Sequence, residues 1–241
     1  MRSGRRPTGA NTHQSRQVRM LVAFRWCGPA GGGRRGSRSW RCPRGKTESM
    51  THDDELFAVL RALAGTRHRY ADAVRLVPAA PGIYAFYGDD EAWDQLGVSR
   101  AFAEQPLYVG KAESSLIGRD VSTHFAAGRT GSSTVRRSLA ALLVDELALV
   151  AIPRNITKPD GSSHFGLDGP SEDRLSSWMA QQLSLATWSK SEGAHLREIE
   201  RGVISRLRPP LNLTHVGEPR DRLRDARQRM ADSARAWTGS R

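Results

Sequence analysis

Residues 81–125 read PGIYAFYGDDEAWDQLGVSRAFAEQPLYVGKAESSLIGRDVSTHF, and this stretch decides the fold. Its first part, residues 82–87, is an apolar and aromatic run opened by Pro81, which is typical of a buried strand. Residues 107–110 predict a second, shorter strand. The polar and acidic residues 88–106 between them suit a loop or short helix, and residues 114–125 predict the start of a longer helix. The stretch therefore predicts two neighbouring strands followed by a helix.

The side chains that this arrangement gathers are chemically reactive rather than typical of a core. They are Tyr84, Tyr108, Lys111, Arg119 and His124. Phosphodiester hydrolysis needs a deprotonated water, charge stabilisation on the phosphoryl oxygens and help for the leaving oxygen. This mixture suits that chemistry, although a tyrosine in a short strand is more often simply packed in the core.

Two tripeptides in this stretch, Gly82-Ile83-Tyr84 and Tyr108-Val109-Gly110, resemble the paired signature of the GIY-YIG nucleases. A third piece lies far downstream, where Glu200 and Asn212 resemble the glutamate helix and the terminal asparagine of that family. The resemblance covers roughly residues 81–125 and 183–213.

The resemblance implies an endonuclease that hydrolyses DNA phosphodiester bonds with Mg²⁺ or Mn²⁺. Glu200 would be the metal ligand, with Tyr84 and Tyr108 beside the metal-bound water and Tyr84 the proton acceptor. A free tyrosine has a pKa of about 10, so nearby cations would have to lower the pKa of Tyr84.

The remaining roles concern phosphate. Arg119 is the candidate phosphate clamp, since a guanidinium stays charged and binds bidentately; its alternative is a solvated arginine. Lys111 would act as base or phosphate contact, and His124 would donate to phosphate or relay a proton. Asn212 follows two prolines, and its amide would either fix the backbone or touch phosphate. Gly82 and Gly110 indicate tight turns or close approach of the backbone.

Glu200 also stands out without the resemblance. On a helix with about 100° per residue it falls about 40° from Leu196, inside a stripe that contains Ile199 and Val203. Glu198 lies on the opposite face. A carboxylate on a buried face is costly unless it is paired, so Glu200 requires either a nearby arginine or a metal ion.

The spacing of Arg119 and His124 departs from the family, in which the two residues usually stand four apart. Here they stand five apart, which places them about 140° apart on a regular helix. Either Arg119 precedes the helix or one assignment is wrong.

The net charge of +12 is concentrated at one end of the chain. Residues 1–49 hold 12 Lys and Arg and one acidic residue, whereas the rest holds 25 basic and 24 acidic residues. The first segment is either a basic nucleic-acid-binding arm or an extension preceding a true start at Met50, and the composition break there favours the second. Both cysteines lie in this segment, so the rest depends on no disulfide and fits a cytoplasmic setting.

Further elements follow from periodicity. Thr51 predicts a helix cap ahead of a packing helix that ends at Gly65. Residues 138–149 predict a helix, residues 150–168 a polar, turn-rich segment, and residues 171–173 the cap of another helix. Residues 183–188 alternate with period two and predict a third strand. The arginine-rich tail predicts a solvated helix with possible phosphate contacts.

These observations predict a mixed α/β (α+β) domain: a small three-stranded, largely antiparallel sheet flanked by helices, with an inserted helical pair. We expect residues 50–80 to form the lead-in, 81–213 the nuclease domain with an insertion at about 128–182, and 214–241 the tail. No apolar run approaches the ~18 residues of a membrane span. DNA is the expected partner, and oligomeric state stays open. The alternative is a catalytically inactive GIY-YIG-like module that binds nucleic acid.

Overall fold

The central element is an antiparallel sheet with the strand order β1-β6-β2-β3. Strand β2 (Gly82–Gly88) lies in its middle, between β3 (Tyr108–Ala112) and β6 (Leu183–Ser189). These are the three predicted strands, each within two residues of its expected bounds. The fourth, β1 (His68–Arg69), pairs with β6 and was missed because two residues carry no periodicity.

The computed structural model describes residues 51–155 and 164–239, apart from the side chains of residues 120–122. These residues belong to one compact unit, residues 48–241. The expected basic arm or extension at residues 1–49, with the expected start at Met50, lies outside the described residues. Within the described part of the chain, no helix is both long and apolar enough to cross a membrane.

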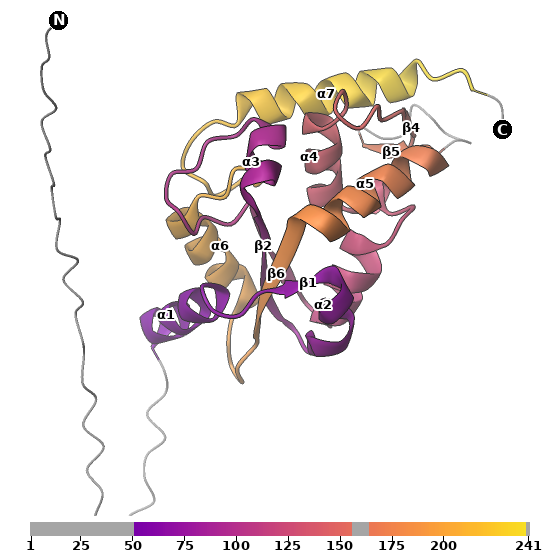
Figure 1. Cartoon of the computed structure of the whole chain (residues 1–241). Coiled ribbons are helices and arrows are strands. Elements are labelled where there is room, and N and C mark those ends of the chain that lie inside the picture. Colours follow the sequence, from indigo (N-terminus) through magenta and orange to yellow (C-terminus); the bar gives the residue numbers. More distant parts are fainter. Residues whose placement is uncertain (1–50, 156–163, 240–241) are drawn as a thin grey trace, which may run out of the picture. The chain divides into compact units, whose positions relative to one another are not determined.

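Each face of the sheet covers a separate core, because successive side chains of β2 point in opposite directions. Ile83, Ala85 and Tyr87 face one core, which α1 (His52–Leu63) and α6 (Leu196–Leu207) complete. Tyr84 and Phe86 face the other. In Figure 1, α1 and α6 lie to one side of the sheet, and α4 and α5 lie to the other. The alternation of β2 therefore decides which aromatic side chains reach the site.

Helix α1 begins as predicted. The side chain of Thr51 accepts a hydrogen bond from the Asp54 amide at 3.2 Å, and the Asp54 carboxylate accepts one from the Thr51 amide at 3.3 Å. This reciprocal capping satisfies two amides that the first turn leaves unpaired. Short helices α2 (Tyr70–Leu76) and α3 (Asp90–Leu96) flank β2, and α3 fills part of the polar segment at 88–106.

Residues 128–182, the expected insertion, contain more than the expected helical pair. Helix α4 (Thr134–Leu142) ends earlier than the predicted 149, because a turn follows Leu143. Strands β4 (Ala151–Pro153) and β5 (Phe165–Leu167) form a small antiparallel sheet where a polar segment was expected. Helix α5 (Gly169–Gln182) is capped by Asp168 rather than by residues 171–173, since the Asp168 carboxylate accepts from the Ser171 amide.

Helix α7 (Asp221–Arg235) is not the solvated helix that its arginines predicted. Leu223, Ala226, Met230 and Ala234 are buried at helical spacing, and the helix packs on α4 and β4. Figure 1 shows α7 running across the ends of these elements. The described part of the expected tail therefore contributes to the second core.

Candidate active site

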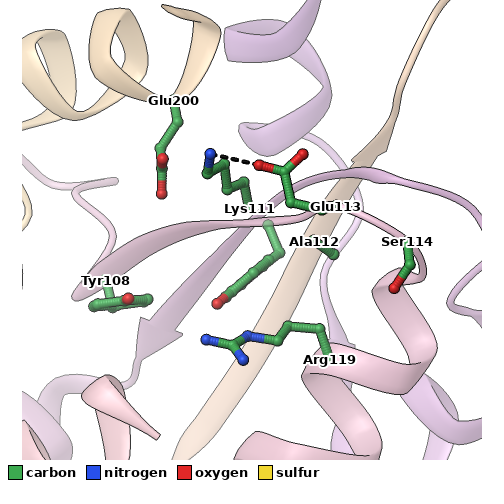
Figure 2. A pocket seen from close by; sticks show the side chains of 8 residues that line it. Tyr108, Lys111, Ala112, Glu113, Ser114, Arg119 and Glu200 are labelled. Atoms are coloured by element: carbon green, nitrogen blue, oxygen red, sulfur yellow. Dashed lines mark ion pairs between the residues drawn. The ribbon is translucent and has the colours of Figure 1, made fainter. Parts of the chain in front are cut away.

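A cavity of about 410 Å³ opens beside β3, the edge strand of the sheet. Figure 2 shows the side chains that line it. They are Tyr84, Tyr108, Lys111, Ala112, Glu113, Ser114, Arg119 and Glu200. The structure thus brings together five of the predicted site residues from β2, β3, the helix after β3 and α6.

The predicted sixth residue, His124, lies directly behind Tyr84. The Tyr84 hydroxyl and Nε2 of His124 are 2.7 Å apart, and Nδ1 of His124 is 2.7 Å from Oγ of Ser133. All three side chains are buried. Burial, and to a lesser extent the charges of Arg119 and Arg136, together lower the pKa of His124 to about 3. His124 is therefore a neutral hydrogen-bonding group at neutral pH.

The five-residue spacing of Arg119 and His124 is explained by a π-helix, η1 (Ile117–Phe125). A π-helix has i→i+5 hydrogen bonds, so residues five apart lie one turn apart on the same face. The first alternative is wrong, because Arg119 lies within the helix. Arg119 lines the cavity and His124 contacts Tyr84 behind it, and the assignment of both residues to the reaction stays a prediction. The regular-helix geometry assumed for the spacing does not apply.

A buried ion pair holds the end of this helix. Arg136, at the start of α4, is fully buried and lies 2.7 Å from the Glu172 carboxylate of α5. Its Nη1 donates to the His124 carbonyl at 2.9 Å. Because a buried charge is stable only when paired and hydrogen-bonded, this network fixes α4, α5 and His124 relative to one another.

Glu200 lies half-buried on α6, as the helical wheel predicted, while Glu198 is exposed on the other face. Figure 2 shows Lys111 between Glu200 and Glu113, with Lys111 Nζ 2.5 Å from the Glu113 carboxylate. Burial raises the pKa of Glu200, Lys111 lowers it and Glu113 raises it again. A further cation at this position would stabilise the ionised carboxylate.

Tyr108 lies between two sources of positive charge. Burial raises the pKa of Tyr108 to about 12, Glu200 raises it too, and Arg119, Arg227 and a hydrogen bond with Tyr84 lower it. The Tyr108 phenol therefore stays protonated at neutral pH. Arg119 itself is exposed, and its guanidinium points into the cavity (Figure 2).

Asn212 contacts main chain. Its Oδ1 accepts from the Val109 amide at 2.9 Å, and its Nδ2 donates to the Val109 carbonyl at 2.8 Å. This favours the first of the two roles that the sequence left open, holding the backbone of β3. A phosphate contact through the second amide hydrogen of Asn212 stays a prediction.

The two motif glycines are required by close approach, as expected. A Cβ on Gly110 would stand 2.4 Å from the Tyr84 hydroxyl oxygen, and one on Gly82 would stand 2.1 Å from the Trp188 carbonyl oxygen. Real Cβ atoms do not approach so closely, so any side chain here would displace Tyr84 or the β2–β6 ladder.

The donor chemistry of the cavity fits a hard divalent cation bound by few protein ligands. Among the residues that the structure describes, no group of three or more His, Cys, Asp or Glu is arranged to hold a metal ion. Glu200 offers one half-buried carboxylate beside an open cavity. Mg²⁺ commonly binds through one or two carboxylates and keeps several waters, so this set suits it better than a metal that needs a full protein cage.

Two neighbours of the site were not anticipated. Glu113 contributes a second carboxylate two residues after Lys111, and Ser133 binds the far side of His124. No periodicity marks either residue. Ser133 also caps α4 by accepting from the Arg136 amide at 3.1 Å, and a capping serine is a signal that the sequence does carry.

Comparison with known proteins gives one match. A family model described as the GIY-YIG catalytic domain matches residues 93–229, more than half of the chain. The matched residues include Tyr108, Arg119, His124, Glu200 and Asn212 and begin after the Gly82-Ile83-Tyr84 motif. No curated protein and no solved structure matches the chain.

Proposed function

This chain belongs to the GIY-YIG family of nucleases, and on that premise we propose that it is a divalent-metal-dependent endonuclease that hydrolyses DNA phosphodiester bonds. The observation that carries the proposal is the single cavity lined by Tyr84, Tyr108, Lys111, Arg119 and Glu200. These residues come from four separate elements, and a purely structural role would not require them to share one water-accessible space.

In this proposal Glu200 holds the metal. Burial disfavours its ionised form, so a bound cation offsets the cost of keeping the carboxylate charged. When bound, Mg²⁺ or Mn²⁺ supplies charge neutralisation at the phosphate and lowers the pKa of a coordinated water.

Arg119 and Lys111 bind the phosphate. Arg119 is exposed, points into the cavity and has two parallel N–H donors for the non-bridging oxygens. Lys111 is paired with Glu113, so it brings its charge to the cavity without leaving an isolated buried ammonium. The two cations thus approach the phosphate from different elements.

Tyr84 accepts the proton of the attacking water. The tautomer of His124 determines whether Nε2 donates a hydrogen bond to the Tyr84 oxygen. Ser133 is buried, and within the described residues Nδ1 of His124 is the acceptor available to its hydroxyl. If Ser133 donates there, Nε2 of His124 carries the hydrogen and donates to the Tyr84 oxygen. This tautomer stabilises the phenolate form of Tyr84, which forms when the phenol loses its proton to solvent and which can then take a proton from the attacking water.

The deciding experiment compares Glu200→Gln with Glu198→Gln, two charge-neutral isosteres on opposite faces of one helix. Supercoiled plasmid is incubated with each purified protein in Mg²⁺ and in EDTA. We expect the parent and E198Q to nick the plasmid only with Mg²⁺, and E200Q to lose at least about 100-fold in rate while keeping its thermal midpoint. Equal cutting by E200Q would remove the metal assignment. DNA retention by a parent that never cuts would identify the inactive nucleic-acid-binding module instead.

A further inference from the structure

A second cavity, of about 250 Å³, lies between α4, β5 and α7. The polar side chains that line it are Arg137, His164, Arg224, Arg227 and Gln228. Three guanidinium groups and no carboxylate are found among the described residues that line it, whereas Glu113 and Glu200 line the catalytic cavity.

Arg137 is the most enclosed of these cations. It is 5% exposed, and its Nε has no hydrogen-bond partner. Its Nη1 donates to the Gly131 carbonyl at 2.8 Å, which satisfies a donor without neutralising the charge. An unpaired buried guanidinium is costly, and a bound anion would remove that cost.

The neighbouring cations are also short of negative partners. Among the residues that the structure describes, no carboxylate makes an ion pair with Arg137 or Arg227. Arg224 approaches only Asp221 of its own helix, at 3.6 Å across an exposed surface, where such pairs stabilise little. Burial, followed by the charges of Arg227 and Arg154, lowers the pKa of Arg137 to about 10. The cavity therefore concentrates positive charge of a kind that binds oxyanions.

Tyr108 is influenced by charges that line both cavities. The charge of Arg227 acts on Tyr108 from the side of α7, and those of Arg119 and Glu200 act on it from the catalytic cavity. Arg137 in turn is influenced by both Arg227 and Tyr108. Charged groups that line both cavities therefore lie within electrostatic range of Tyr108.

We propose that Arg137, Arg224 and Arg227 form a second phosphate subsite, which binds a backbone phosphate of the nucleic-acid substrate next to the scissile one. The subsite rests on the proposed nuclease function for its ligand. Guanidinium groups suit it because their paired donors match phosphate oxygens bidentately and stay charged at all physiological pH values. Its role is to hold the strand in register across Tyr108, so it contributes binding rather than chemistry.

The test measures binding rather than cutting. Arg227→Gln removes one charge from the subsite, and Arg229→Gln removes one from an exposed position two residues further along α7, on another face. Each protein is titrated with a short duplex DNA in EDTA over a range of salt concentrations. We expect R227Q to lower the slope of log K against log [salt] by about 0.9, the contribution of one phosphate, while R229Q keeps the parent slope.

Arg227→Lys is the control for a purely structural effect of the Arg227→Gln substitution. Lysine keeps the charge and loses the bidentate geometry, so the parent slope should return with a weaker affinity. Three results would overturn the subsite. They are equal salt slopes for R227Q and the parent, an equal loss of slope in R227Q and R229Q, and a parent protein that binds no DNA. The proposed cleavage needs Mg²⁺, and this assay contains EDTA, so it measures binding alone. Its result can therefore be interpreted even if the protein does not cut DNA.

Discussion

The hydroxyl of Tyr84 lies against the backbone of Gly110, its partner across the β2–β3 ladder, so closely that a Cβ there would come within 2.4 Å of it. The second motif therefore makes room for the tyrosine of the first. The same hydroxyl is 2.7 Å from His124, so any displacement of it is transmitted to a buried hydrogen bond.

Gly110→Ala should displace Tyr84 and disable the site. Overpacking of this kind costs about 1–3 kcal/mol of stability, and misplacing a reacting group lowers the rate further. Urea unfolding and a plasmid-nicking assay measure the two effects. Gly169→Ala is the matched control, since its added methyl would meet nothing within 4 Å. An unchanged nicking rate in G110A would show that Tyr84 has room to move.

Asn212→Leu should release the edge of β3. The substitution removes both hydrogen bonds to Val109 and leaves two buried polar groups unpaired, each of which costs about 1–3 kcal/mol. We expect faster hydrogen exchange of the Val109 amide, measured by NMR. Amides of the β2–β6 ladder, such as Ala186, serve as the internal reference. Unaltered protection of Val109 would count against this role.

Acid should destabilise the protein in part through His124. Its folded pKa is lowered to about 3, below the ordinary value of 6.5, so between these pH values the unfolded chain binds a proton that the folded one excludes. The stability that follows from the neutral form is fully present above pH 6.5 and is lost as the pH falls toward 3. It changes by up to about 1.4 kcal/mol per pH unit.

Urea unfolding of the parent and of His124→Gln at a series of pH values measures this effect. The variant should be less stable throughout, with a shallower decline between pH 6.5 and 4, and the two curves should run parallel above pH 7.5. An identical acid decline in both proteins would mean that His124 is protonated in the fold.

Glu172→Gln should be among the most destabilising charge-neutral changes. It leaves the fully buried Arg136 without its counter-charge, which typically costs about 3–5 kcal/mol. Asp90→Asn breaks the exposed Arg100–Asp90 pair and should cost at most about 1 kcal/mol. Chemical denaturation compares the two. Similar small losses would indicate that water reaches Arg136.

The sequence predicted the parts of the fold that repeat. The apolar and aromatic run of residues 82–87 placed one strand. The alternation of residues 183–188 placed another, and the wheel of residues 196–207 placed Glu200 on a partly buried face. Both are local patterns with a fixed period, and the site follows from them once the strands pair.

Elements whose sequences show no hydrophobic periodicity were not predicted. Strand β1 is two residues long, and the β4–β5 hairpin has three residues in each strand. The many arginines of α7 predict a solvated helix by composition, although the spacing of its apolar residues is that of a helix with one buried face. The π-helix has no propensity signature of its own, although the five-residue spacing of Arg119 and His124 was its visible trace.

The bond between Asn212 and Val109 also bears on how the protein behaves among other copies of itself. An edge strand presents unpaired amides and carbonyls that can recruit a strand from another chain. On β3, the amide and carbonyl of Val109 are both hydrogen-bonded to the Asn212 side chain. Just before the strand, the carbonyl of Leu107 accepts a hydrogen bond from the Leu211 amide. The opposite edge is β1, which is only two residues long. Both edges of the sheet therefore offer little template for another strand, which disfavours edge-to-edge association between copies of the protein.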